Sequence, residues 1–176
     1  MKNSYALVTG ATSGIGLEIS KDLARRGFDL ILVARTTEKL VKISNELTQE
    51  YNIKCDYFSS DLTLIDSPNQ IYQFTNQKKY NVDILVNNAG YALSRAFHKN
   101  SMEEEEKCLR VLGTSVIALT KNYINDMISN GGGKIMIVSS VAAFAPASSL
   151  QSLYGPVKTF MNRFSESLSF YNKYGI

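Results

Sequence analysis

A short apolar strand that runs directly into a glycine-rich turn is the feature that most constrains this chain. Residues 5–8 (Tyr-Ala-Leu-Val) precede the segment 9–16, Thr-Gly-Ala-Thr-Ser-Gly-Ile-Gly, which opens an amphipathic helix pattern. Three glycines within seven residues let an anion approach main-chain N–H groups at a helix N-terminus. Because the spacing Gly-x-x-x-Gly-x-Gly differs from the common dinucleotide fingerprint, the segment is either a phosphate-binding turn or an ordinary glycine-rich turn.

Strand and helix patterns alternate along the rest of the chain. Further strands are predicted at 30–34, 54–59, 83–87 and 134–139, and helices at 15–26, 36–51, from 66–68 onward, 102–128 and 151–174. Such alternation predicts an α/β fold in which a doubly wound parallel sheet is covered on both faces by right-handed crossovers. We expect the strand order 3-2-1-4-5, with a ligand crevice at the carboxyl ends of the first and fourth strands.

Composition and charge limit the alternatives. With 176 residues, 44% of them hydrophobic, and neither repeats nor a linker, the chain is expected to form one domain over 1–176. The net charge of +3 comes from scattered residues without a basic run, which argues against a nucleic-acid partner. Cys55 and Cys108 lie far apart and the single His98 has no cluster around it, so we expect buried thiols, no disulfide and no metal. Without a membrane-length apolar stretch or room for a signal peptide, a cytoplasmic location without membrane partners is expected.

Residues that can carry chemistry follow the second and fifth predicted strands. Arg35 ends the second strand, where a basic residue accommodates the 2'-phosphate of NADP, although it could instead only solvate the strand end. Tyr154 and Lys158 are spaced i, i+4 on one helix face, so the ammonium can favour the ionised phenol and make it a general acid–base group. Ser140, at the end of the fifth strand, could donate a hydrogen bond to a carbonyl oxygen. Taken alone, the Tyr-x-x-x-Lys spacing is weak evidence, since both residues are common on exposed helices.

Taken together, these segments resemble the short-chain dehydrogenase/reductase family, in its large branch of single-domain Rossmann enzymes. The resemblance also rests on Asp61-Leu62 after the third strand and on Asn87-Asn88-Ala89-Gly90 after the fourth. It implies a pyrophosphate turn made of Gly10, Ser13, Gly14, Ile15 and Gly16. It further implies Arg35 as the NADP marker, an adenine contact at Asp61 and Leu62, and a nicotinamide-ribose contact at Asn88, Ala89 and Gly90.

The reaction is implied by the same resemblance. In the family, the tyrosine matching Tyr154 gives or takes the substrate proton, and the serine matching Ser140 steadies the carbonyl. The lysine matching Lys158 tunes the phenol and holds the nicotinamide ribose. The expected function is an oxidoreductase that transfers hydride between NADP(H) and a small ketone, aldehyde or 3-oxo compound and its alcohol. Because the long helix and the Tyr-bearing helix commonly pack against a second subunit in this family, a homodimer or homotetramer is expected.

Three departures from the family pattern affect this expectation. The family usually places an asparagine in the long helix, where this chain has Leu112 in a gapless reading or Arg110 in a shifted register. The interval from Ser140 to Tyr154 is one residue longer than usual, which leaves Ser139 the weaker candidate of the two serines. The sequence ends where family members continue with further strands, so we expect an incomplete domain. The alternative expectation is a catalytically impaired nucleotide-binding or scaffold protein derived from such an enzyme.

Three aromatic residues follow the fourth and fifth predicted strands. Tyr91, Phe97 and Phe144 either line a substrate pocket or pack in the interior, and the sequence favours neither. His98 is expected in a surface loop.

Overall fold

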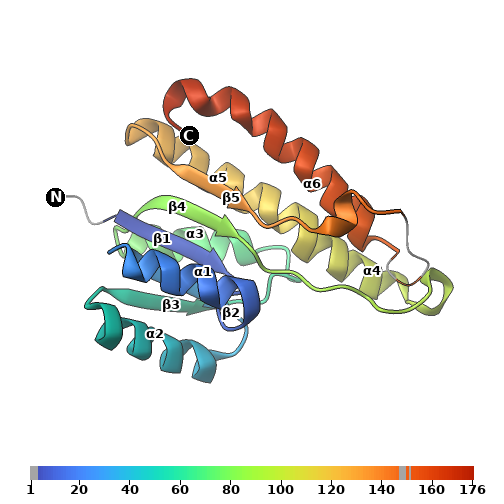
Figure 1. Ribbon diagram of the computed structural model, residues 1–176, viewed down its shortest axis with the longest axis horizontal. Coiled ribbons are helices and arrows are strands. Elements are labelled where there is room, and N and C mark those ends of the chain that lie inside the picture. The colour runs from blue at the N-terminus through green and yellow to red at the C-terminus, as the bar shows by residue number, and fades with distance from the viewer. Residues whose placement is uncertain (1–3, 147–149, 151) are drawn as a thin grey trace.

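The computed structural model describes residues 4–146, 150 and 152–176, and in this part of the chain a parallel sheet of five strands lies at the centre (Figure 1). The strands are β1 (Ser4–Thr9), β2 (Asp29–Ala34), β3 (Cys55–Ser59), β4 (Asn81–Asn87) and β5 (Lys134–Ile137). They are ordered β3-β2-β1-β4-β5, and every neighbouring pair is parallel. This confirms the predicted doubly wound α/β class and the strand order. β5 ends two residues earlier than expected, and β4 begins two residues earlier.

Helices cover both faces of the sheet (Figure 1). One face carries α1 (Gly14–Arg25) and α2 (Thr37–Tyr51), whose apolar residues pack on alternate residues of β1 and β2. On the other face lie α3 (Ser67–Gln77), α4 (Met102–Leu109), α5 (Ser115–Ser129) and α6 (Tyr154–Leu168). Short 3-10 helices η1 (Phe97–Lys99), η3 (Val141–Ala143) and η4 (Ser169–Tyr174) lie outside these layers.

The predicted continuous helix over 102–128 is wrong in its middle. A π-helical segment, η2 (Arg110–Thr114), separates α4 from α5. Ser115 Oγ donates to the carbonyl oxygen of Val111 at 2.9 Å, a side-chain bond of the kind that perturbs a regular helix. Because a π turn is a single short interruption inside a helix, the apolar pattern over 102–128 does not reveal it.

The last helix is shorter than the predicted range 151–174. α6 covers Tyr154–Leu168 and is followed by the 3-10 helix η4, while Gln151 lies outside the described residues. The hydroxyls of Ser167 and Ser169 donate to the carbonyl oxygens of Phe164 and Glu166, both at 2.7 Å, and so compete with the helix ladder. Phe170 is 79% exposed, so little packing holds the following residues in α-helical form.

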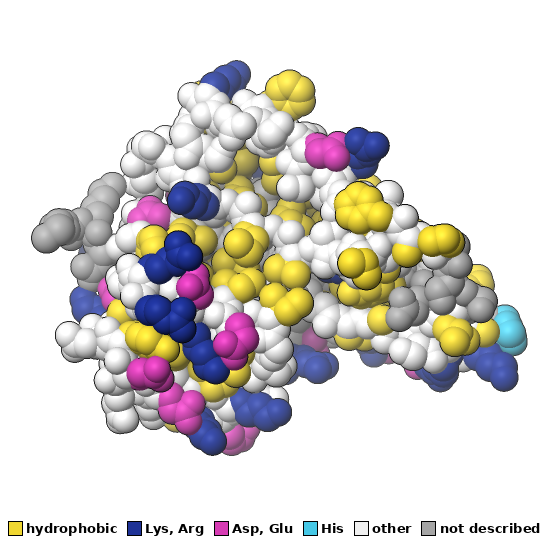
Figure 2. All heavy atoms as spheres, viewed as in Figure 1, with side chains coloured by type: hydrophobic (Ala, Val, Ile, Leu, Met, Phe, Trp, Pro, Cys, Tyr) yellow, Lys and Arg dark blue, Asp and Glu magenta, His cyan; other side chains and the backbone are white. Residues whose placement is uncertain are grey.

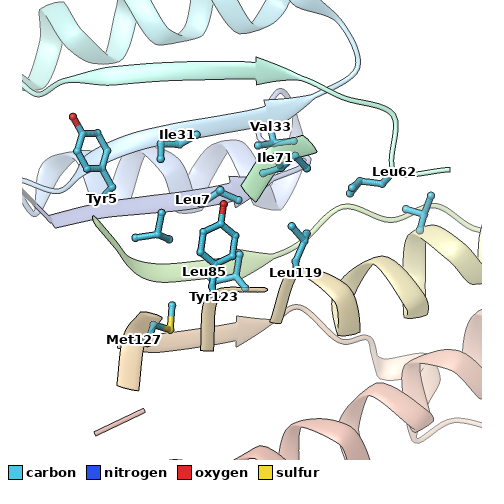
Figure 3. Close-up of a cluster of buried hydrophobic side chains, with 12 residues drawn as sticks. Tyr5, Leu7, Ile31, Val33, Leu62, Ile71, Leu85, Leu119, Tyr123 and Met127 are labelled. Atoms are coloured by element: carbon cyan, nitrogen blue, oxygen red, sulfur yellow. The ribbon is translucent and has the colours of Figure 1, made fainter. Parts of the chain in front are cut away.

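An apolar cluster between the sheet and helices α3 and α5 fixes the positions of the strands (Figure 3). Its members come from every strand except β3 and β5, and they include Tyr5, Leu7, Ile31, Val33, Leu62, Ile71, Leu85, Leu119, Tyr123 and Met127. The Tyr123 hydroxyl shares a 2.9 Å hydrogen bond with Thr75 Oγ1, so this buried polar group is satisfied. Burying each large side chain of this kind contributes ~1.5–3 kcal/mol to the free energy of folding. The packed cluster therefore keeps β1, β2 and β4 in register, with their carboxyl ends at one edge of the sheet.

The two cysteines differ in burial. Cys108 is buried, but Cys55 is only partly buried because β3 is an edge strand, so the prediction of two buried thiols holds for one of them.

Within residues 4–146, 150 and 152–176, no cluster of three His, Cys, Asp or Glu side chains could hold a metal ion. No helix in the described part of the chain is both long and apolar enough to cross a bilayer. On the face shown in Figure 2, basic and acidic side chains are mixed rather than separated by sign.

Candidate functional site

A cleft of about 590 Å³ opens at the carboxyl ends of the central strands. The residues that the sequence singled out and that line it are Gly10, Ser13, Ile15, Arg35, Asp61, Leu62, Asn88, Ala89, Gly90, Tyr91, Ser139, Tyr154 and Lys158. Gly14, Gly16 and Ser140 are not part of this lining. Sequence reasoning missed several lining residues, among them Thr12, Lys39, Ser60 and Val138. The topology therefore brings residues from across the chain to one site.

The glycine turn is shaped by two close approaches. Gly10 has φ +67, and a Cβ there would lie 2.8 Å from Asn88 Nδ2 and 2.9 Å from Ala89 Cα. A Cβ at Gly16 would overlap the carbonyl oxygen of Gly10 and the side-chain amide of Asn88. The turn can thus pack against the end of β4 only with glycine at both positions.

Hydrogen bonds hold the ends of β1 and β4 together beneath the cleft. Asn88 Nδ2 donates to the carbonyl oxygens of Thr9 and Gly10 at 2.9 and 3.3 Å. Thr9 Oγ1 donates to Val86 O and accepts from the main-chain N–H groups of Asn88 and Ala89 at 3.0 and 3.1 Å. The Asn88 amide is therefore used to hold the main chain, and Thr9, which sequence reasoning missed, is the centre of this network.

Besides Lys158, two basic side chains line the cleft. Arg35, at the end of β2, lines it together with Thr36 and Lys39, and Lys39 lies in the first turn of α2. Ser60 also lines this cleft, and its Oγ is buried without a hydrogen-bond partner among the described residues. The position of Lys39 four residues after Arg35 is a sequence signal that could have identified it as a second cation.

Tyr154 and Lys158 lie next to each other on the wall of the cleft. Lys158 Nζ is 5.8 Å from the centroid of the Tyr154 ring and donates to Val138 O at 2.6 Å. Lys158 is 6% exposed, and burial lowers the pKa of its ammonium group. The ammonium of Lys158 therefore lies over the ring of Tyr154 on the same wall of the cleft.

The two serines after β5 have different surroundings. Ser139 lines the cleft, and its Oγ is buried without a hydrogen-bond partner among the described residues. Ser140 is the N-cap of η3, where its Oγ accepts from the N–H of Ala142 at 3.2 Å. A substrate-steadying role for Ser140 stays a prediction, and the geometry makes Ser139 a second candidate.

Leu112, in the π-helical segment, occupies the place beside Lys158. It is 1% exposed and packs in an apolar cluster with Cys108, Val116, Val157 and Met161. A Cβ on Gly90 would lie 2.8 Å from Leu112 Cδ2 and 4.0 Å from Lys158 Nζ, so the glycine makes room for the leucine. Arg110 instead lines a separate groove with Leu64 and Ile65, which favours the gapless register.

The aromatic residues after β4 and β5 divide into two groups. Tyr91 lines the cleft. Phe97 and Phe144 are 62% and 83% exposed, so the expectation that they pack in the interior is wrong. Neither is part of the cleft lining, and their place in a substrate pocket stays a prediction. His98 is exposed in η1, as expected.

Comparison with known proteins places this geometry in a family. The family model described as short chain dehydrogenase matches residues 4–176. The fatty acyl-CoA reductase of Acinetobacter baylyi is 33% identical over 171 residues, which cover 96% of this chain and 57% of that protein. The chain spans about half the length of most of the curated relatives it matches.

Solved structures agree with this assignment. The bulky-bulky ketone specific alcohol dehydrogenase of Comamonas testosteroni superposes with a TM-score of 0.92 at 28% identity, covering 100% of this chain and 70% of that one. A short-chain dehydrogenase of Sphingobium yanoikuyae, solved in complex with NADPH, gives a TM-score of 0.88 at 31% identity, covering 95% and 64% of the two chains. With a family match over nearly all of its length and the same fold, the chain belongs to the short-chain dehydrogenase/reductase family.

Proposed function

We propose that the protein containing this chain is an NADP(H)-dependent oxidoreductase that interconverts a small carbonyl compound and its alcohol. The observation that carries the proposal is the placement of Tyr154 and Lys158 on the wall of the cleft that also contains the glycine turn and Arg35. A ketone-specific alcohol dehydrogenase and a fatty acyl-CoA reductase among the similar proteins support a carbonyl or alcohol substrate. The relative solved with NADPH supports the cofactor.

The residues of the cleft fit a dinucleotide. Two lining hydroxyls, Ser60 Oγ and Ser139 Oγ, are buried without a partner among the described residues, as expected where a polar ligand binds. We infer that the pyrophosphate is held at the N-terminus of α1 by the turn of Gly10, Ser13, Gly14, Ile15 and Gly16. We assign the 2'-phosphate to Arg35, the adenine to Asp61 and Leu62, and the nicotinamide ribose to Asn88, Ala89, Gly90, Tyr154 and Lys158.

The chain's own residues would perform the proton chemistry. A bound nicotinamide supplies the hydride in reduction or accepts it in oxidation. In reduction, Tyr154 donates its phenolic proton to the carbonyl oxygen, and the nearby Lys158 ammonium stabilises the phenolate that remains. A hydroxyl of Ser140, or of Ser139 in the cleft wall, donates a hydrogen bond to the same oxygen.

Oxidation of NADPH with a panel of small ketones, aldehydes and 3-oxo compounds tests this proposal. We expect turnover by the full-length protein and a loss of at least ~100-fold in Tyr154→Phe, because general acid catalysis contributes about that much. Equal rates in the two proteins, or none in either, would overturn the enzymatic assignment. Leu112, where the family usually has asparagine, favours the second candidate, a nucleotide-binding protein without catalysis, which would then still bind NADPH.

The cofactor assignment has its own test. We expect Arg35→Ala to weaken NADPH binding by about 10- to 100-fold, because that is the expected effect of losing one hydrogen bond to a charged group. NADH lacks the 2'-phosphate, so its binding should be unchanged. Arg26→Ala is a suitable control, since Arg26 pairs with Asp22 on the exposed side of α1. If the ratio of NADPH to NADH affinity is the same in Arg35→Ala and the wild type, Arg35 does not read the 2'-phosphate.

The remaining expectations are also part of the proposal. We expect a homodimer or homotetramer, and the exposed Leu64 and Ile65 beside Leu109 form an apolar groove suited to a subunit contact. Light scattering of the purified protein tests this. A single domain over 1–176 and a cytoplasmic location stay predictions.

A further inference from the structure

A buried carboxylate on α4 faces the segment that leads into the Tyr154 helix. Glu105 is 2% exposed, and its Oε1 accepts hydrogen bonds from Asn100 Nδ2 at 2.8 Å and from Ser152 Oγ at 2.6 Å. None of the ion pairs among the described residues involves it. Side chains such as Glu are almost never fully buried unless they are paired, so this placement needs an explanation.

The arrangement around Glu105 leaves two acceptors unused. Glu105 Oε2 and Asn100 Oδ1 are both buried without a hydrogen-bond partner among the described residues. They belong to the two side chains that the 2.8 Å bond already joins. A chain that needed only to fill this space would use an apolar side chain, because unpaired buried polar atoms are costly.

Ser152 is the link between this carboxylate and the cleft. It lies two residues before Tyr154, the first residue of α6, and next to Leu153, the N-cap of that helix. Leu153 and Tyr154 pack against the apolar cluster that contains Cys108 and Leu112 of the α4 and π-helical segments. The hydrogen bond from Ser152 to Glu105 therefore joins the start of α6 to α4 across 47 residues of sequence.

We propose that Glu105 is a positioning residue that holds Ser152 and thereby sets the place of Tyr154 beside Lys158. Glu105 does not line the cleft, so it acts through Ser152 and not on the substrate or cofactor. The effect on catalysis rests on the proposed function, whereas the tie between α4 and α6 does not. A misplacement of a reacting group by about 1 Å can cost up to ~100-fold in rate, so the tie matters for turnover.

Three variants of the full-length protein separate positioning from general stability. Glu105→Ala and Ser152→Ala both break the tie, and we expect each to lower kcat by about 10-fold or more while KM for NADPH changes less than about twofold. Glu105→Gln keeps the Oε1 acceptor for Ser152 and replaces Oε2 with a donor suited to Asn100 Oδ1, so it should retain wild-type kcat. Glu106→Ala, at the neighbouring exposed carboxylate, is the matched control.

Hydrogen exchange gives a readout that does not depend on activity. Val157 N donates to Leu153 O at 2.9 Å, and Pro156 has no amide hydrogen, so exchange of the amides of Val157 and Lys158 reports on the start of α6. We expect ~10-fold faster exchange there in Glu105→Ala and Ser152→Ala, wild-type exchange in Glu105→Gln, and no change in β1 or β4. If the wild type proves inactive, the proposed function fails, and the exchange data still decide whether the tie exists.

Several outcomes would contradict a positioning role for Glu105. Wild-type exchange and kcat in Ser152→Ala would overturn the proposal, as would a Glu105→Gln variant as impaired as Glu105→Ala. Faster exchange throughout the sheet, in place of a change confined to Val157 and Lys158, would assign Glu105 a purely structural role. Should Glu105→Ala fail to fold, the milder Ser152→Ala and Glu105→Gln variants still give these outcomes.

Discussion

Replacing Gly16 by alanine tests whether close packing of the glycine turn holds the cleft together. The new Cβ would overlap the carbonyl oxygen of Gly10 and the side-chain amide of Asn88. Neither atom can move away freely, because Asn88 Nδ2 donates to the carbonyl oxygens of Thr9 and Gly10. The substitution must therefore shift main chain at the junction of β1, β4 and α1.

The expected cost follows from three contributions. Overpacking of a well-packed site costs ~1–3 kcal/mol. Loss of one hydrogen bond of Asn88 adds ~1 kcal/mol, and the higher helix propensity of alanine returns about the same amount. The free energy of unfolding should thus fall by about 1–3 kcal/mol, which corresponds to a Tm lower by roughly 2–12 °C for a chain of this size.

Thermal unfolding of Gly16→Ala and of a matched glycine variant measures the effect. Gly113→Ala is the control, since Gly113 is also helical and a Cβ there would make only ordinary 3.6 Å contacts with Leu109 and Val157. We expect Gly113→Ala to be as stable as the wild type or more so, and NADPH binding to be lost only in Gly16→Ala. Equal Tm values for the two variants would refute the packing argument.

Three further outcomes follow from burial. Burial raises the pKa of the Cys55 thiol to about 12 and also raises the pKa of the Cys108 thiol. Both thiols should therefore resist alkylation at pH 8 in the native protein and react after denaturation, and rapid labelling of the native protein would contradict this. Burial lowers the pKa of Lys158 below its ordinary 10.5, so just below that pH the unfolded chain binds more protons than the folded one. The free energy of unfolding measured in urea should therefore rise with pH in this range, and this rise should be absent in Lys158→Met. Leu112→Ala, at a 1% exposed position, should lower the free energy of unfolding by about 2–5 kcal/mol in urea titrations, and a loss under 1 kcal/mol would mean that the cluster repacks.

Much of the fold could be predicted from local signals. Apolar runs such as 30–34 became buried strands at the expected places, because burial on both faces of a parallel sheet demands a continuous apolar segment. The spacing of Tyr154 and Lys158 fixed their common helix face, and the structure has Lys158 Nζ 5.8 Å from the Tyr154 ring. The π-helical segment at 110–114 was missed, since a single turn of five residues is too short to show in the apolar pattern over 102–128.

The sequence by itself determined the order of the strands, the glycine turn and the residues at each strand end, since these depend on periodicity, turn chemistry and the handedness of crossovers. Only the tertiary structure decided which side chains meet. It placed Ser139 in the cleft wall and Ser140 at a helix cap. It also joined Glu105 to Ser152, a contact between segments 47 residues apart. Such contacts depend on the packing of whole elements, and no local pattern in the chain encodes them.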